Sequence, residues 1–160
     1  MSEAQCRANL TTLLQQLTAY FPSSSQVNTG NYSAVDMGVS NAAIMTVGQF
    51  APTNPIAREQ MRDWDIPLDI FQRFGVNDAA TDWAAFGTFR DDLLALIDVH
   101  PRLLPTNHAS EDIGVIKTTV KSDAAPYLVK RDKSGIVFMF QPLRVTVTQR
   151  IALTGGEYPT

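Results

Sequence analysis

The sequence predicts an α+β fold, with two helices packed on one face of a mainly antiparallel sheet of four to five strands. Two patterns of apolar spacing lead to this prediction. In residues 2–20 and 79–100, apolar side chains recur every three or four positions, as in amphipathic helices. In residues 64–74 and 143–151, they alternate with polar side chains, as in half-buried strands. Every element then has one apolar side, and stacking the helices on the sheet buries all of these sides together.

The composition is that of an ordinary globular domain. The 160 residues are 44% hydrophobic and 18% charged, and we expect one domain over residues 1–160. A net charge of -3 disfavours nucleic acid as a principal partner, because phosphate neutralisation needs a basic surface. No run approaches the ~20 apolar residues of a membrane span, and no secretion signal is visible, so we expect synthesis in the cytoplasm and no membrane partner. The single cysteine, Cys6, excludes an intrachain disulfide and fits a reducing compartment.

A capping box formed by Ser2 and Gln5 predicts the start of the first helix, which should end near Tyr20, before Pro22. Its apolar stripe consists of Cys6, Leu10, Leu13, Leu14 and Leu17. The Ser-, Asn- and Gly-rich residues 22–40 have no periodicity and are predicted to be a loop.

A hairpin is expected next, with residues 41–50 pairing with the strand that begins at Trp64. The connection between them is either a loop or an extension of both strands into a protruding hairpin. Pro67 has no N–H for a ladder bond, so the second strand should lie at a sheet edge or be bulged there. Phe71 points away from the apolar side of this strand, and it either packs beneath another element or contacts another subunit.

The second helix should start near Ala79, capped by Asn77 or Asp78, and end near His100 because Pro101 follows. Trp83 is expected to be central in the core.

The C-terminal part predicts further strands. Residues 115–121 alternate, residues 127–129 and 136–140 suggest a hairpin, and Gln141 with Pro142 suggests a bulge before the last strand. We expect residues 122–135 to form an exposed hairpin and residues 152–160 a loosely held tail. Candidate exposed contacts of the hairpin loop are Lys130, Arg131, Asp132 and Lys133.

No pattern in the chain predicts catalysis or a cofactor. His100 and His108, with Glu111 or Asp112, match no zinc signature, so solvated histidines are favoured over a metal site. Paired carboxylates could serve as acid and base, but a solvent-facing position explains them as well. The candidates are Asp91 with Asp92, and the group of Asp63, Asp65 and Asp69. The chain also lacks a nucleophile elbow and a phosphate-binding loop. We therefore expect neither an enzyme nor a cofactor.

Residues 63–103, preceded by 34–50 and followed by 138–151, resemble the tail terminator proteins of long-tailed bacteriophages. The shared pattern is an N-terminal helix, a hairpin, a Trp-containing helix that ends at the turn His-Pro-Arg-Leu of residues 100–103, and long final strands. It covers about residues 4 to 151.

The resemblance implies a virion structural protein of the tail or neck, made in the host cytoplasm, which forms a ring, commonly a hexamer. Its partners would be further copies of itself, the tail tube protein and a head–tail connector or head-closure protein, with DNA only in transit through the lumen. The outward side of the strand around Pro67 is then a candidate subunit interface, with Asp65, Asp69, Phe71 and Arg73.

Two alternatives stay open. Another neck protein would co-purify with a different part of the particle, and a small-ligand or enzymatic α+β domain would show a well-formed polar pocket.

Overall fold

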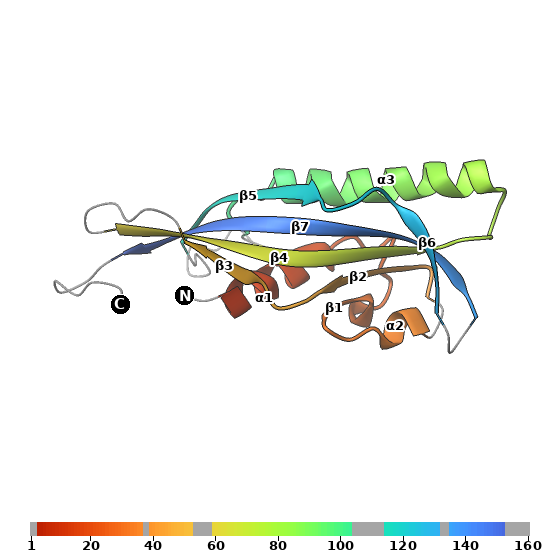
Figure 1. Ribbon diagram of the computed structural model, residues 1–160, viewed down its shortest axis with the longest axis horizontal. Coiled ribbons are helices and arrows are strands. Elements are labelled where there is room, and N and C mark those ends of the chain that lie inside the picture. Colours follow the sequence, from red (N-terminus) through yellow and green to blue (C-terminus); the bar gives the residue numbers. More distant parts are fainter. Residues whose placement is uncertain (1–2, 37–38, 53–58, 104–113, 132–134, 153–160) are drawn as a thin grey trace.

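The computed structural model describes residues 3–36, 39–52, 59–103, 114–131 and 135–152 (Figure 1). The helices within them are α1 (Glu3–Leu14), the 3-10 helix η1 (Ser24–Gln26), α2 (Ser33–Asp36) and α3 (Ala79–Asp98). The strands are β1 (Val27–Thr29), β2 (Asn41–Met45), β3 (Gln49–Pro52), β4 (Glu59–Arg73), β5 (Val115–Ser122), β6 (Tyr127–Lys130) and β7 (Val137–Ala152). All of these strands belong to one mixed sheet that is mostly antiparallel. The predicted α+β class is confirmed.

Two long strands form the middle of the sheet. β4 and β7 pair antiparallel from Glu59 opposite Ala152 to Arg73 opposite Phe138, without interruption. The strand order is β1-β2-β4-β7-β5, and β3 and β6 pair with the remaining lengths of β4 and β7. The described sheet has seven strands, more than the four to five expected. Residues 41–50 divide between β2 and β3, and the region expected to be a loop contributes β1, which pairs with β2 in parallel.

Each long strand contains a proline, and each proline faces a gap in the neighbouring strand. Pro67 lies between the lengths of β4 that pair with β2 and β3, and its carbonyl accepts the N–H of Thr46 (3.2 Å). Pro142 lies between the lengths of β7 that pair with β5 and β6, and its carbonyl accepts the N–H of Asp123 (3.0 Å). The N–H and C=O of one residue point to the same side of a strand, so each missing N–H falls at a gap and not in the β4–β7 ladder.

This arrangement corrects two predictions. The strand around Pro67 is central rather than at an edge, and it is not bulged at that residue. The bulge predicted at Gln141 and Pro142 is also wrong, because the pairing with β4 runs through both residues. The register shift is found in β5 instead, between Val115 and Lys117.

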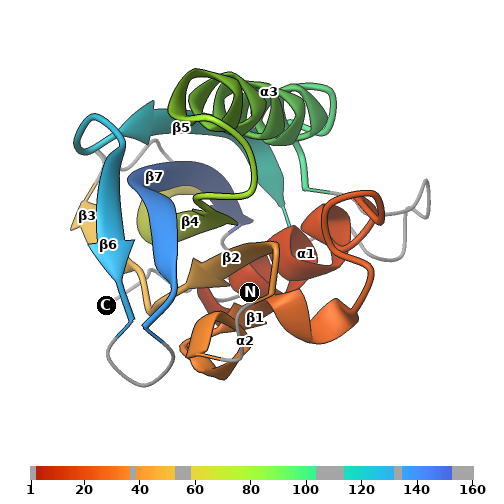
Figure 2. The ribbon, with the colours of Figure 1, turned by 90° about the vertical axis from the view of Figure 1, so that its right-hand side faces the viewer.

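The helices α1 and α3 contribute to one core with the inward sides of β4 and β7, as predicted. Seen along the long strands, the sheet is curled and the two helices are neighbours (Figure 2). The core residues of these four elements are Cys6, Leu10, Leu13 and Leu14 of α1, Ile66, Leu68 and Ile70 of β4, Phe86, Phe89, Leu93 and Ile97 of α3, and Met139, Leu143, Val145 and Val147 of β7.

The helix boundaries are partly as predicted. Asp78 caps α3 by accepting the N–H of Thr81 (2.9 Å), which confirms the predicted start. α1 ends at Leu14 rather than near Tyr20, because the following residues turn back with shorter-range bonds such as that from the N–H of Leu17 to the carbonyl of Leu14 (3.1 Å). Ser2 of the predicted capping box lies outside the described residues.

Trp83 is only half-buried, so its predicted central position is wrong, and Phe86 and Phe89 fill the core instead. For the connection left open between a loop and a strand extension, both strands do extend, as far as Pro52 opposite Arg62, while residues 53–58 lie outside the described residues. The predicted hairpin of β6 with the start of β7 is also present, with Lys130 opposite Val137.

Candidate functional site

The outward face of the sheet, opposite α1 and α3, carries the candidate subunit interface. Toward the β3 end of this face, the Thr146 hydroxyl donates a hydrogen bond to the carboxylate of Asp65 (2.7 Å), and the Thr148 hydroxyl donates one to that of Asp63 (2.7 Å). Arg144 lies 4.0 Å from the carboxylate of Asp65 and 3.3 Å from that of Asp123. These carboxylates are engaged across the sheet by their register partners and neighbours.

Farther along β4, around Phe71, the same face is covered by the segment around α2. Phe71 is 3% exposed and forms a second cluster with Val35, Ala42, Ile44 and Phe138. Of the two alternatives for Phe71, packing beneath another element is the one observed, because the segment around α2 lies over it. Phe71 therefore offers almost no exposed surface to a second subunit.

Asp69 is held by that covering segment. The hydroxyl of Tyr32 donates to its carboxylate (2.8 Å), and the guanidinium of Arg131 lies 5.6 Å from the Tyr32 ring centre. Burial raises the pKa of Asp69, and the Tyr32 hydrogen bond opposes this in part. Burial and the bond to Asp69 raise the pKa of Tyr32 to about 12. The carboxylate thus serves an internal contact.

The remaining predicted contacts are more open. Arg73 and Lys130 are exposed, and Arg131 is half-buried through its position over Tyr32. Asp132 and Lys133 lie outside the described residues. The structure brings Asp69, Phe71 and Arg131 together beside Tyr32, whereas Arg73 and Asp65 lie at different points along β4. Their proposed role in subunit contacts stays a prediction.

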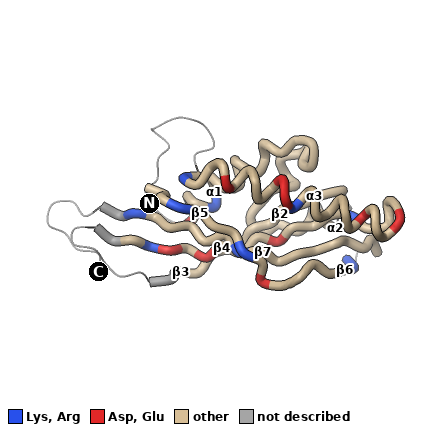
Figure 3. The backbone as a smooth tube through the Cα atoms, turned by 90° about the horizontal axis from the view of Figure 1, so that it is seen from above, with Lys and Arg blue, Asp and Glu red and all other residues tan. Residues whose placement is uncertain are grey.

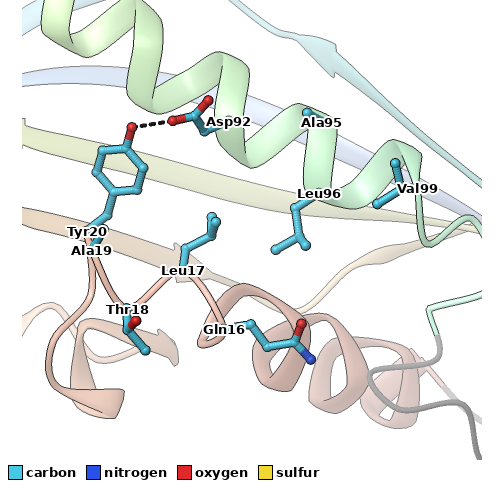
Figure 4. A pocket seen from close by; sticks show the side chains of 9 residues that line it. All are labelled: Gln16, Leu17, Thr18, Ala19, Tyr20, Asp92, Ala95, Leu96 and Val99. Atoms are coloured by element: carbon cyan, nitrogen blue, oxygen red, sulfur yellow. Dashed lines mark hydrogen bonds between the residues drawn. The ribbon is translucent and has the colours of Figure 1, made fainter.

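A groove that sequence reasoning did not identify lies between α3 and the turn after α1 (Figure 4). Its volume is about 550 Å³, and its lining is mainly apolar: Gln16, Leu17, Thr18, Ala19, Tyr20, Asp92, Ala95, Leu96 and Val99. The hydroxyl of Tyr20 donates to Asp92 across one end, and this bond raises the pKa of Tyr20 to about 12. The groove could have been suspected from the sequence at Val99, because this apolar residue lies outside the apolar stripe predicted for the second helix. In the structure Val99 is 70% exposed.

The described residues hold no cluster of three or more His, Cys, Asp or Glu side chains suited to a metal ion. Nδ1 of His100 lies 2.9 Å from the carbonyl of Leu96, while His108, Glu111 and Asp112 lie outside the described residues. Cys6 is buried, and burial raises the pKa of its thiol to about 11. None of the described helices is long and apolar enough to span a bilayer.

Neither a protein-family model nor a curated protein matches the chain. The resemblance to tail terminators therefore stays a hypothesis that rests on the pattern of elements and motifs.

Proposed function

We propose that this chain is a virion structural protein of the tail terminator type. In this role it forms a ring at the head-proximal end of a phage tail tube, stops tube polymerisation and joins the tail to the head–tail connector. It acts by binding and not by catalysis. The observation that carries the proposal is the unit formed by β4, α3 and β7, because it contains the segments that resemble tail terminators and the His-Pro-Arg-Leu turn after α3.

The physical properties of the fold support this proposal. The uninterrupted β4–β7 ladder, with α1 and α3 on one face, makes a stiff body that can keep its shape within an assembly. A ring needs two different surfaces on each copy, and the chain has exposed strand edges as well as an apolar groove. A net charge of -3 limits attraction to DNA passing through a lumen.

Electron microscopy of the purified protein mixed with polymerising tail tube protein tests the proposal. We expect rings of constant size at one end of each tube, and tubes that stop growing once a ring is bound. The matched control is tube protein polymerised alone. A chain that neither forms rings nor binds tubes would contradict the proposal. Binding to the connector without binding to tubes would indicate a head-closure protein instead.

A further inference from the structure

We propose that the groove between α3 and the turn after α1 receives strand β6 of a second copy of this chain. The inference rests on the proposed ring, and it names the two surfaces that join neighbouring subunits. We call them the α3 groove, lined by the nine residues given above, and the β6 edge, formed by Tyr127–Lys130.

Both surfaces expose apolar side chains. Val99 of the α3 groove is 70% exposed, and Tyr127 and Leu128 of the β6 edge are 48% and 45% exposed. One surface is concave and the other is a strand with an unpaired edge, since β6 pairs only with β7 among the described strands. The groove is open to solvent and has a volume of about 550 Å³, which leaves room for side chains of this size. Joining the two surfaces would remove apolar area from water on both partners.

A charged residue beside the α3 groove is complementary to one in the β6 edge. Asp98 does not line the groove but directly precedes Val99, which does, and it lies in the last turn of α3. That turn contains no basic residue, and a carboxylate there opposes the helix dipole. Neither the side chain of Asp98 nor that of the exposed Lys130 has a hydrogen-bond or ion-pair partner in the part of the chain that the structure describes. Figure 3 shows acidic residues along α3 and basic residues at β6. A neighbouring copy can supply the opposite charge for each of them.

The placement of the surfaces favours a ring over a symmetric pair. Figure 2 shows β6 and α1 on opposite sides of the molecule, and the α3 groove adjoins the turn after α1. The two surfaces therefore cannot meet within one chain. A contact between two different surfaces is heterologous, and repetition of such a contact closes a ring when the rotation allows it. Pairing two α3 grooves with each other would instead bring like charges together.

Paired cysteines test the contact directly. In the double variant Ala95→Cys, Leu128→Cys, a short bismaleimide should link α3 of one copy to β6 of the next and give a ladder of multiples up to the ring size. Each single variant, with only one of the two reactive positions, should give no ladder. The native Cys6 is fully buried and should not react in the folded protein.

Substitutions measure the strength of the contact. Val99→Asp should raise the concentration at half-assembly by about tenfold or more, since it places a charge in an apolar contact. The matched control is Val76→Asp, because Val76 is 66% exposed but does not line the groove. Asp98→Lys and Lys130→Glu should each weaken assembly, and their combination should restore it. Unchanged thermal unfolding of each variant would show that the fold is intact.

The outcomes separate this inference from the proposed function. Rings on tail tubes formed by a double cysteine variant that gives no cross-linked ladder would overturn the inference and leave the function standing. Dimers linked through Leu128→Cys alone would show symmetric pairing of β6 edges and would also overturn it. A wild-type chain that neither assembles nor binds tubes would overturn both.

Discussion

Removal of the Tyr32 hydroxyl should destabilise the fold more when residue 69 is an aspartate than when it is an asparagine. The hydroxyl donates to the half-buried carboxylate of Asp69 at 2.8 Å. A hydrogen bond to a charged group contributes about 1.5–3 kcal/mol, whereas a neutral one contributes about 0.5–1.5 kcal/mol. Tyr32→Phe should therefore cost about 2 kcal/mol in the natural chain and about 1 kcal/mol in the Asp69→Asn background. The coupling between the two positions should be about 1 kcal/mol.

The same pair predicts how stability depends on pH. Burial raises the pKa of Asp69 in the folded state above its unfolded value of 3.8. At pH values between these two pKa values, the Asp69 carboxyl is therefore more protonated in the folded chain than in the unfolded chain. The contribution of Asp69 to stability is then complete below pH 3.8 and is lost as the pH rises through the folded pKa. Asp69→Asn should remove this dependence and be at least as stable as the natural chain at pH 7. Tyr32→Phe should raise the pKa of Asp69 further, because it removes the bond that opposes burial.

Urea unfolding followed by tryptophan fluorescence would measure both effects, since Trp64 and Trp83 both pack against the core. The natural chain, Tyr32→Phe, Asp69→Asn and the double variant form a double-mutant cycle, and all four should be compared at pH 7 and across the acid range. Tyr127→Phe is the matched control, because this tyrosine is 48% exposed and should change stability by less than about 0.5 kcal/mol. If Tyr32→Phe lowered the unfolding free energy equally in both backgrounds, the hydrogen bond from Tyr32 to the Asp69 carboxylate would not be the source of the stabilisation.

Four further predictions concern single positions. Phe89→Ala, at a side chain with no exposed area, should lower the unfolding free energy by about 3–5 kcal/mol in urea denaturation. Asp78→Ala should cost about 0.5–2 kcal/mol by removing the cap of α3, and Asp78→Asn should recover most of that loss. Gly48→Ala should cost about 1–3 kcal/mol, because its Cβ would lie 2.8 Å from the backbone carbonyl oxygen of Asp65, and an unchanged melting temperature would contradict this. Arg73→Glu should weaken ring formation on tail tubes while the circular dichroism and melting temperature stay unchanged, whereas a loss of folding would mean that Arg73 is part of the core contacts.

The sequence predicted the elements whose periodicity is strong. The stripes of α1 and α3 and the alternation in β4 and β7 correspond to the buried residues of the main core. The cap at Asp78 was also predictable, because a single side chain next to the helix start decides it. Trp83 was misplaced because the period of a helix defines a broad stripe and does not say which of its residues lies at the centre.

The two prolines show why topology was harder to predict. A proline inside a strand pattern normally indicates an edge, since it cannot donate a ladder hydrogen bond. Pro67 and Pro142 are compatible with central strands only because the neighbouring strands are interrupted opposite them. Those interruptions depend on the pairing register, which the local pattern of either segment cannot reveal. Thr46 and Asp123, which donate to the proline carbonyls, could have been found only from the three-dimensional arrangement.

The second cluster changes which surfaces are available to partners. An apolar residue on the outward side of a strand, such as Phe71, has the same sequence pattern whether its cover is a neighbouring subunit or the chain itself. The cover here includes Tyr32 and Val35 in a segment with a four-residue helix, which is too short to show any periodicity. Because that segment buries Phe71 and binds Asp69, the outward side of β4 is largely used within the subunit. The apolar surfaces that remain exposed at Val99 and at β6 are therefore the stronger candidates for contacts between copies.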